Sequence, residues 1–491
     1  MKILTSIFLL IGFAFIGFTQ NKPESVIWGE KLKKTNNLSD FIYKNESLYT
    51  INEQLKSIQK FSPDKLNLIN TLSLDGVMGE LEGLTFDLYS SMQKLIEYKD
   101  GFGLIISQLS KDKKKKYFGF FEIDGDLSKI QTKGKLLFEI DLGKKEDYQV
   151  SEVVIANENY QGIYSRKGFV SDKEEILFAQ LDIVMANDKV LTEEFVYYQD
   201  ELSHKYFALS DDVVLIQDWK ENSSDVRLYD GKNGNLIKEF SLFDILDEEY
   251  DARILSVKKN SKGEYIMAGF YGDISKDDVE MTGLFKFTLN AQGKSDRNSL
   301  ITYVLTEINS TVENVNLYKV QITDKGDIFF VMTSQMGQIR GNTLTTSTQF
   351  EQLMVVGLHG DEIWAKSIPF RQAYGMTAWP DHMGLNITEL NGHLTLCYND
   401  NHKNGKKFDY NNFVYNTKSR PDKYICSSPD AIAIIDIDTK GYVKPYFIDV
   451  YDLFININDA ILLADGVLFI SGNGATVAGG GKSRFAKVIL E

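Results

Sequence analysis

Cysteine, histidine and proline are scarce in this chain of 491 residues, which contains 2, 5 and 7 of them, respectively. Two cysteines, far apart in the sequence, do not indicate a zinc site. The shortage of proline argues against a string of β-sandwich domains, because the Pro-rich linkers that would join such domains are missing. Neither a Gly-x-Ser-x-Gly elbow nor a His-Glu-x-x-His motif occurs, which removes two common kinds of hydrolase site.

Basic residues are also in short supply, since 54 Lys and Arg stand against 69 Asp and Glu and give a formal net charge of −15. Such a chain repels nucleic acid and anionic lipid at long range, so we expect no nucleic-acid partner. One basic run, residues 111–116, is interrupted only by Asp112. We expect it to be a solvated hairpin loop, with docking of an acidic partner as the alternative.

Long hydrophobic runs are missing except at the N-terminus, where residues 3–18 are almost wholly apolar after Lys2. Gly17 and Thr19 fit the small-residue positions of a cleavage site, which predicts a signal peptide over residues 1–19. The run is too short for a membrane span, and no cysteine near the cut indicates a lipoprotein. We therefore expect a soluble chain exported to the periplasm, the cell surface or the medium, without membrane insertion after signal removal. A retained, uncleaved anchor is the alternative.

An exported location would permit a disulfide between the two cysteines, Cys397 and Cys426. Closing that loop would stabilise the fold by about 3 kcal/mol in the chain-entropy model. Both residues lie beside apolar or tyrosine residues, so two buried free thiols are an equal alternative.

One short phrase recurs along the whole chain: an apolar run, a turn with Asp, Asn or Lys before Gly, and a second apolar run. Clear examples surround Asp100-Gly101, Lys325-Gly326 and Asp465-Gly466. Such turns between β-rich runs make hairpins, because Gly and Asn accept the positive φ that a tight turn demands. Recurrence at roughly 50 to 75 residues predicts a radial array of small sheets.

A second phrase, in which a buried strand is followed by a polar turn and a short strand, is typical of the outer strands of a propeller blade. It occurs at residues 121–127, 227–237, 284–294 and 433–443. Together the two phrases resemble a β-propeller over nearly all of residues 20–491, which we treat as one domain. The predicted fold is all-β, a single β-propeller of about seven four-stranded blades (range six to eight), with about 67 residues per blade.

The resemblance is to the architecture, because the regular Gly-His…Trp-Asp pairs of WD40 repeats and the Ser-x-Asp-x-Gly-x-Thr-Trp box of sialidases are both missing. The chain is also similar to uncharacterised exported propeller-like proteins of Bacteroidota, a resemblance that implies no activity. Residues 468–490 are expected to pair with the N-terminal strand and so close the ring, since closure removes exposed strand edges.

Long loops are the best functional lead, because loops on a rigid scaffold carry binding residues. They are expected at residues 334–349, 371–384 and 399–429. Exposed aromatic side chains beside amides and acids suit sugar rings or peptide backbones. The alternative is that these aromatics only fix their own loops to the scaffold. The candidate ligand-binding residues are Tyr374, Trp379, Asp381, His382 and His402.

Three of the five histidines, His382, His393 and His402, fall close together in the sequence. Imidazole with a carboxylate can bind a metal or move a proton, but these spacings do not place two ligands on one strand face, which favours a chance cluster. Asp400 and Asn404 match part of a calcium-binding loop, although Asn411 stands where its closing Glu belongs. We therefore expect no cofactor, with calcium at Asp400 and Asn404 as the alternative.

The sequence assigns no catalytic residue. The leading hypothesis is an exported, monomeric binding or scaffold module that recognises a protein or glycan partner in the cell envelope through loops on one face. The alternative is a carbohydrate-active hydrolase or lyase, with carboxylates that converge at the central channel. An enzyme should gather several acids and a histidine there, whereas a binding module should present aromatics and amides at the rim.

Overall fold

The computed structural model describes residues 23–32, 38–141, 149–153, 161–172, 175–186, 189–197, 203–210, 212–220, 223–244, 250–273, 280–294, 300–304, 316–339, 346–373, 384–415, 420–425, 431–450, 453–463, 465–474 and 484–490. The predicted signal peptide, residues 1–19, lies outside these ranges. Among the helices of the described part, none is long and apolar enough to cross a membrane.

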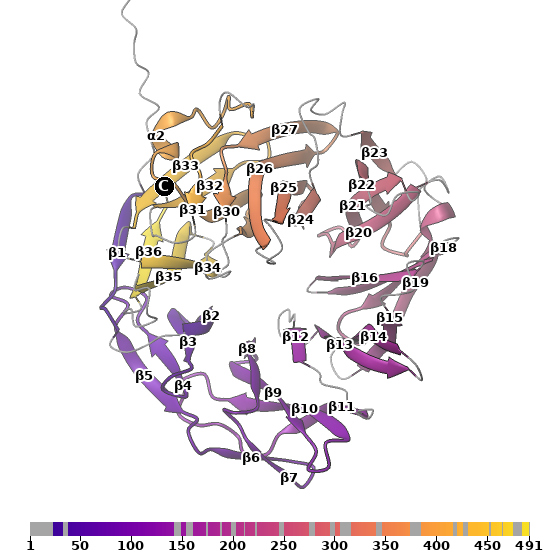
Figure 1. Ribbon diagram of the computed structural model, residues 1–491, viewed down its shortest axis with the longest axis vertical. Coiled ribbons are helices and arrows are strands. Elements are labelled where there is room, and N and C mark those ends of the chain that lie inside the picture. Colours follow the sequence, from indigo (N-terminus) through magenta and orange to yellow (C-terminus); the bar gives the residue numbers. More distant parts are fainter. Residues whose placement is uncertain are drawn as a thin grey trace, which may run out of the picture.

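The protein is an all-β propeller whose small antiparallel sheets stand around a ring (Figure 1). Within the described residues, seven sheets have four strands and one has six. The prediction of an all-β propeller with about seven four-stranded blades is therefore confirmed, and the larger sheet brings the total to the upper end of the predicted range. We call these sheets blades 1 to 8.

Blade 1 contains β2 (Leu38–Lys44), β3 (Ser47–Asn52), β4 (Ser57–Phe61) and β5 (Leu68–Ser73), and blade 2 contains β8 (Met92–Tyr98), β9 (Gly101–Leu109), β10 (Lys115–Ile123) and β11 (Lys135–Asp141). Blade 3 contains β12 (Gln149–Val153), β13 (Gln161–Asp172), β14 (Glu175–Ala186) and β15 (Lys189–Tyr197), and blade 4 contains β16 (Ser203–Ser210), β17 (Val213–Lys220), β18 (Ser223–Asp230) and β19 (Leu236–Ser241).

Blade 5 contains β20 (Tyr250–Lys259), β21 (Tyr265–Asp273), β22 (Glu280–Leu289) and β23 (Ile301–Val304). Blade 6 contains β24 (Asn316–Ile322), β25 (Ile328–Ile339), β26 (Thr346–His359) and β27 (Glu362–Ile368), and is enlarged by β28 (Gln372–Ala373) and β31 (Tyr424–Ile425). Blade 7 contains β29 (Asn386–Leu390), β30 (His393–Asp400), β32 (Ala431–Ile437) and β33 (Val443–Asp449).

Blade 8 contains β34 (Leu453–Leu462), β35 (Val467–Gly474), β36 (Arg484–Ile489) and, from the other end of the chain, β1 (Ser25–Trp28). The remaining elements are a hairpin of β6 (Met78–Leu81) and β7 (Leu84–Asp87), the short 3-10 helix η1 (Leu242–Asp244) and the single-turn helix α2 (Asn404–Lys407).

The tight turns that the sequence predicts join neighbouring strands within the blades. Gly326 has φ of 91° and donates its N–H to the carbonyl of Thr323 at 3.0 Å, between β24 and β25. Gly466 has φ of 77° and bonds in the same way to Leu463 at 3.0 Å, between β34 and β35. A side chain with Cβ disfavours this left-handed conformation, which explains why glycine recurs at these turns.

The hydrophobic core is divided into layers that lie between neighbouring blades. In β25, Phe329 and Val331 pack towards blade 7, while the alternate residues Phe330 and Met332 pack towards blade 5. Successive residues of a strand point to opposite faces, and here both faces are covered. This is why the middle strands of the blades read as continuous apolar runs instead of alternating apolar and polar residues.

Pairing of β1 with β36 closes the ring, as the sequence predicts. The two strands are antiparallel, with Ser25 opposite Ile489 and Trp28 opposite Ala486. Arg484 strengthens the seam, because its guanidinium lies 5.0 Å from the ring centroid of Trp28 and its Nε donates to the carbonyl of Gly29 at 2.9 Å. The first and last strands of the described chain therefore complete one blade together.

The innermost strand of each blade borders the centre of the ring (Figure 1). Six of these eight strands, β2, β8, β12, β20, β24 and β34, contain a break in register against the next strand of their blade. A bulge of this kind bends the strand and redirects the side chain of the extra residue. The inner wall is thus less regular than the outer strands.

Strand direction divides the connections between two faces of the ring. Because all neighbouring strands within the blades are antiparallel, the first-to-second and third-to-fourth connections of every blade lie on one face. We call it the short-turn face, since it carries tight turns such as residues 260–263, 323–326 and 391–392. The opposite face carries the second-to-third connections and the links between blades, and we call it the long-loop face.

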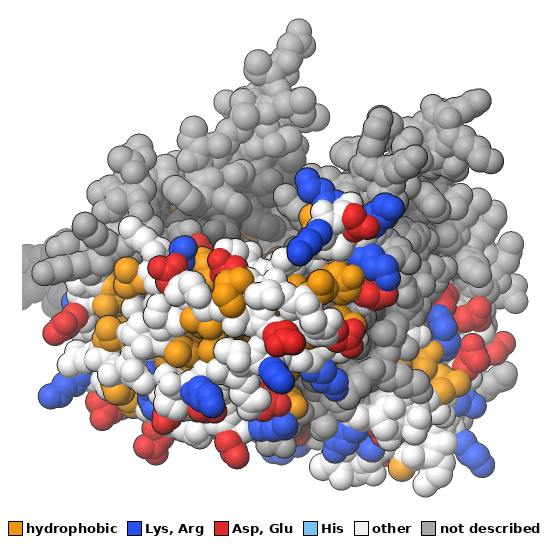
Figure 2. Space-filling model, turned by 90° about the horizontal axis from the view of Figure 1, so that it is seen from below, with side chains coloured by type: hydrophobic (Ala, Val, Ile, Leu, Met, Phe, Trp, Pro, Cys, Tyr) orange, Lys and Arg blue, Asp and Glu red, His pale blue; other side chains and the backbone are white. Residues whose placement is uncertain are grey.

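Seen from below, acidic and basic side chains are interspersed with apolar ones over the described surface (Figure 2). No large area of one charge sign dominates this view. Surface charge there gives little long-range steering towards a charged polymer.

Replacement of Phe485 by Ala should weaken the whole ring, because this fully buried side chain of blade 8 packs on two rings of blade 1. The ring centroids of Phe41 and Phe61 lie 5.4 and 4.8 Å from that of Phe485. Urea unfolding should show a loss of about 3–5 kcal/mol in a single transition. Tyr442, which is 61% exposed, is the control, and Tyr442→Ala should change stability by less than about 0.5 kcal/mol. Equal losses in the two variants would contradict a seam between blades 8 and 1.

Candidate functional site on the long-loop face

The candidate residues Tyr374, Trp379, Asp381 and His382 lie outside the described residues, as does Cys426. The residues that flank the first four, Ala373 and Gly384, are described and fix where that segment leaves and rejoins the fold. His402 is described and directly precedes helix α2. The site is therefore built here from the scaffold around these positions.

Three connections of blades 6 and 7 meet on the long-loop face. The hairpin of β25 and β26 continues as a paired ladder to Ile339 and Thr346, so much of the loop expected at residues 334–349 is in fact strand. Phe350 of this extension pairs with Gln372 of β28, and Gln372 pairs in parallel with Tyr424 of β31. We call β28, β31, α2 and residues 400–415 and 420–425 the loop platform.

Gln372 joins the parts of the loop platform through a completely buried amide. Its Nε2 donates to the carbonyl of Asn399 at 2.8 Å, and its Oε1 accepts the N–H of Gly384 at 2.9 Å. Beside it, the N–H of Tyr424 donates to the carbonyl of Arg371 at 2.9 Å. Buried amides that satisfy backbone groups in this way hold a loop in one arrangement, since the loss of the bond would leave those groups unpaired.

A second buried amide, that of Asn404, fixes the turn at the start of the platform. Its Nδ2 donates to Oδ1 of Asp400 at 2.7 Å and to the carbonyl of Asp422 at 2.9 Å, while its Oδ1 accepts the N–H of Asp422 at 2.8 Å. Asp400 and Asn404 are both completely buried. Calcium at these two residues stays a prediction; binding would require the amide of Asn404 to turn its oxygen away from Asp422 and towards the ion.

The aromatic residues of the platform that the sequence analysis considered are mostly packed into the core. The rings of Phe408 and Phe413 meet edge to face at 5.0 Å, and Tyr410 lies 5.8 Å from Phe447 of β33. Burial is also the main reason why the pKa values of Tyr398 and Tyr410 are raised well above the ordinary value. For these rings, the alternative that aromatics fix their own loops describes the structure better than direct ligand contact.

Cys397 is a buried free thiol in the apolar layer between blades 7 and 8. Burial raises the pKa of this thiol to about 12, so it stays protonated and unreactive at neutral pH. Because Cys426 lies outside the described residues, the disulfide between them remains a prediction.

The histidine cluster expected from the sequence is divided between the two faces. His393 begins β30 at the short-turn face, and His402 follows the end of the same strand at the long-loop face. The Nδ1 of His393 lies 3.0 Å from Oδ2 of Asp436, within its own blade. These two histidines therefore cannot share one ligand, which agrees with a chance cluster.

The structure adds Tyr318 to the candidate site, a residue that the sequence analysis did not select. A bulge between Leu317 and Lys319 makes Tyr318 the extra residue of β24, and the side chain is 43% exposed. Its hydroxyl oxygen lies 3.3 Å from the position that a Cβ on Gly384 would occupy. Tyr318 thus stands at the inner edge of the ring, next to the point where residues 374–383 rejoin the fold.

Lys319 follows Tyr318 and bridges blades 6 and 7 along the inner wall. Its Nζ donates to the carbonyl of Ile387 in β29 at 2.9 Å. The side chain is reached by solvent but lies among protein atoms, and this loss of hydration lowers the pKa of its amine. The rim of the candidate site therefore combines an exposed phenol, an amine and the amide-rich loop platform.

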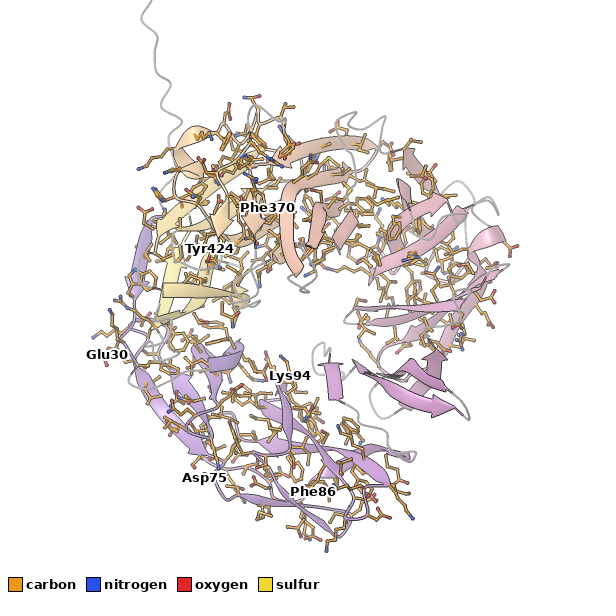
Figure 3. All side chains as sticks on the ribbon, viewed as in Figure 1. Glu30, Asp75, Phe86, Lys94, Phe370 and Tyr424 are labelled. Carbon is orange, nitrogen blue, oxygen red and sulfur yellow. The ribbon has the colours of Figure 1, made fainter. Side chains whose placement is uncertain are left out.

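Carboxylates on the described inner wall are compensated by cations. Asp40 of β2 forms an ion pair with Lys94 of β8, and its Oδ2 accepts the N–H of Leu95 at 3.0 Å. In Figure 3, Lys94 lies at the inner edge of the ring, whereas Phe370 and Tyr424 lie between blades 6 and 7. No group of three or more His, Cys, Asp or Glu side chains suited to a metal ion occurs in the part of the chain that the structure describes.

No family model matches the chain, and no curated protein matches it. Solved structures that are similar include the WD40 domain of SCAP from fission yeast, with 8% identity, a TM-score of 0.33, and coverage of 95% of this chain and 98% of that chain. The uncharacterized protein lmo1340 from Listeria monocytogenes EGD-e has 10% identity, a TM-score of 0.33, and coverage of 84% and 97%. The β-propeller domain of the Trilobed protease from Pyrococcus furiosus has 8% identity, a TM-score of 0.34, and coverage of 82% and 95%. Similarity at this level carries no argument about function.

The amine of Lys319 should lose its proton at a lower pH than an ordinary lysine, whose pKa is 10.5. The measurement is an NMR titration after reductive ¹³C-methylation, with Lys319→Arg used to assign the signal. Because the folded state disfavours the charged amine, stability should rise with pH between the lowered pKa and 10.5, and Lys319→Met should remove that rise. A midpoint at or above 10.5 would show that the amine keeps its full hydration.

Proposed function

We propose that the protein is an exported binding module that recognises a protein or glycan partner through the long-loop face, centred on Tyr318 and the loop platform. The observation that carries the proposal is the buried amide of Gln372, which joins connections of two blades into one surface. A surface ordered before binding loses less conformational entropy when a partner arrives. A propeller that served only as a spacer would have no need of it.

The chemistry at the rim supports this kind of partner. Tyr318 presents an apolar ring and a hydroxyl group, which suit the apolar faces and polar edges of sugars or peptides. The segment that carries Tyr374, Trp379, Asp381 and His382 rejoins the fold beside it at Gly384. We include these four residues and His402 in the proposed contact surface.

The location and assembly of the protein belong to the same proposal. The apolar segment at residues 3–18 supports export through a signal peptide, and the net charge of −15 argues against nucleic acid as the partner. We propose a monomer in the periplasm, on the cell surface or in the medium. A carbohydrate-active hydrolase is not developed further, because the described carboxylate Asp40 at the inner wall is already paired with Lys94.

The proposal is tested with two exposed tyrosines on opposite faces, Tyr318 at 43% and Tyr442 at 61% exposure. Tyr442 lies in the turn between β32 and β33, on the short-turn face. The chain is first screened on a glycan array and against envelope proteins, and each partner is then titrated with both Ala variants. Tyr318→Ala should weaken binding by about tenfold or more, and Tyr442→Ala should leave it unchanged.

The two arms of the screen distinguish a glycan from a protein partner. A partner whose affinity falls with Tyr442→Ala and not with Tyr318→Ala would place recognition on the short-turn face and contradict the proposal. Turnover of a bound glycan would also contradict it, in favour of the enzyme alternative. Unfolding curves of both variants show whether any loss of affinity comes from loss of the fold.

A further inference from the structure

A polar cavity lies on the short-turn face, away from the loop platform, between blades 4 and 5. It has a volume of about 270 Å³. The residues that line it come from turns of both blades: Asp212, Asp230 and Lys232 on one side, and Lys259, Asn260, Ser261 and Gly263 on the other. The cavity is smaller than most sites for drug-sized ligands, so it suits a molecule with few non-hydrogen atoms.

The wall from blade 4 offers a carboxylate that is held in place. Oδ1 of Asp230 accepts the N–H groups of Lys232 at 2.8 Å and Asn233 at 3.2 Å, while its Oδ2 has no partner among the described residues. The neighbouring charges of this wall neutralise each other, because Nζ of Lys232 lies 3.3 Å from Oδ1 of Asp212. The N–H of Gly231 donates to the carbonyl of Asp212 at 2.8 Å and ties the two turns together.

The wall from blade 5 offers an amine. Nζ of Lys259 lies 5.4 Å from the ring centroid of Tyr265 and makes no ion pair with any described residue. The turn behind it is fixed, since Oδ1 of Asn260 accepts the N–H groups of Lys262 at 3.0 Å and Glu264 at 2.9 Å. Gly263 completes this turn with φ of 79°.

The cavity therefore presents one uncompensated ammonium group and one carboxylate oxygen from opposite walls, and these two groups do not pair with each other. We propose that it binds a small zwitterion, a molecule with one amino and one carboxylate group. The amino group donates to Oδ2 of Asp230, and the carboxylate accepts from Nζ of Lys259. Charge-assisted hydrogen bonds of this kind are shorter and stronger than neutral ones.

Ligands of a single charge fit this cavity less well. An inorganic cation would face the amines of Lys232 and Lys259, and an anion would face the carboxylates of Asp212 and Asp230. A zwitterion avoids both repulsions. Since both walls are fixed by their own turns, little rearrangement is needed when the ligand enters.

Calorimetric titration of the full chain at neutral pH tests the proposal with a series of increasing charge separation: glycine, β-alanine and γ-aminobutyrate. Butyrate and butylamine are the single-charge controls. At least one zwitterion should bind about tenfold or more tightly than either control, because it engages both walls. Equal binding of all these compounds, or binding of none, would overturn the proposal.

Three variants locate the binding within the chain. Asp230→Asn keeps the Oδ1 acceptor that holds its turn, and Lys259→Met keeps the stem over Tyr265, so each removes mainly a charge. Each should weaken the zwitterion by about tenfold. Lys262→Met, in the same turn but outside the cavity lining, should have no effect. Unchanged affinity in the first two variants, or calcium or phosphate binding that depends on them instead, would overturn the assignment.

Discussion

The antiparallel pairing of β1 with β36 is the constraint on which the rest of the structure depends. Each blade buries both of its faces against neighbours, so blade 1 and blade 8 are complete only when they meet each other. The rings of Phe41, Phe61 and Phe485 fill the layer between them. Since β1 comes from the start of the fold and β36 from its end, all the intervening blades must be in place before this contact forms.

Closure of the ring also determines which connections become neighbours. Antiparallel strands return every second connection to the same face, and a closed ring fixes the distance between blades 6 and 7. Their long connections then lie close enough for β28 and β31 to extend the sheet of blade 6. Gln372 and Asn404 satisfy the backbone groups that this extension would otherwise bury without partners. The loop platform is thus a consequence of the ring and of two amide side chains.

The sequence predicted the repeating part of this architecture well. Turns such as Lys325-Gly326 and Asp465-Gly466 have a local signature, because only a few residues accept positive φ, and the apolar runs between them repeat in every blade. Closure by the terminal strands also followed from the architecture. The extension of β25 and β26 beyond the blade was missed, since Thr, Ser, Gln and Gly in residues 334–349 read as a loop.

The candidate site was harder to predict, for physical reasons. The exposure of Tyr318 depends on a one-residue bulge in β24, and register has no signature in a single strand. The role of Gln372 depends on partners at Gly384 and Asn399, which the sequence does not bring together. Phe408 and Tyr410, in contrast, looked available for ligands but are buried by residues from other strands. Local patterns identify strands and turns, whereas the site arises from contacts between blades.

The central claim is that the long-loop face is ordered before any partner binds. Native-state hydrogen exchange tests it at the amides of Gly384, Asp422 and Tyr424, which donate to Gln372, Asn404 and Arg371. The account predicts that these amides exchange slowly, at rates close to those of the strand amides of β30 in the same blade region. Exchange at the rates of an unfolded chain, while β30 stays protected, would contradict it.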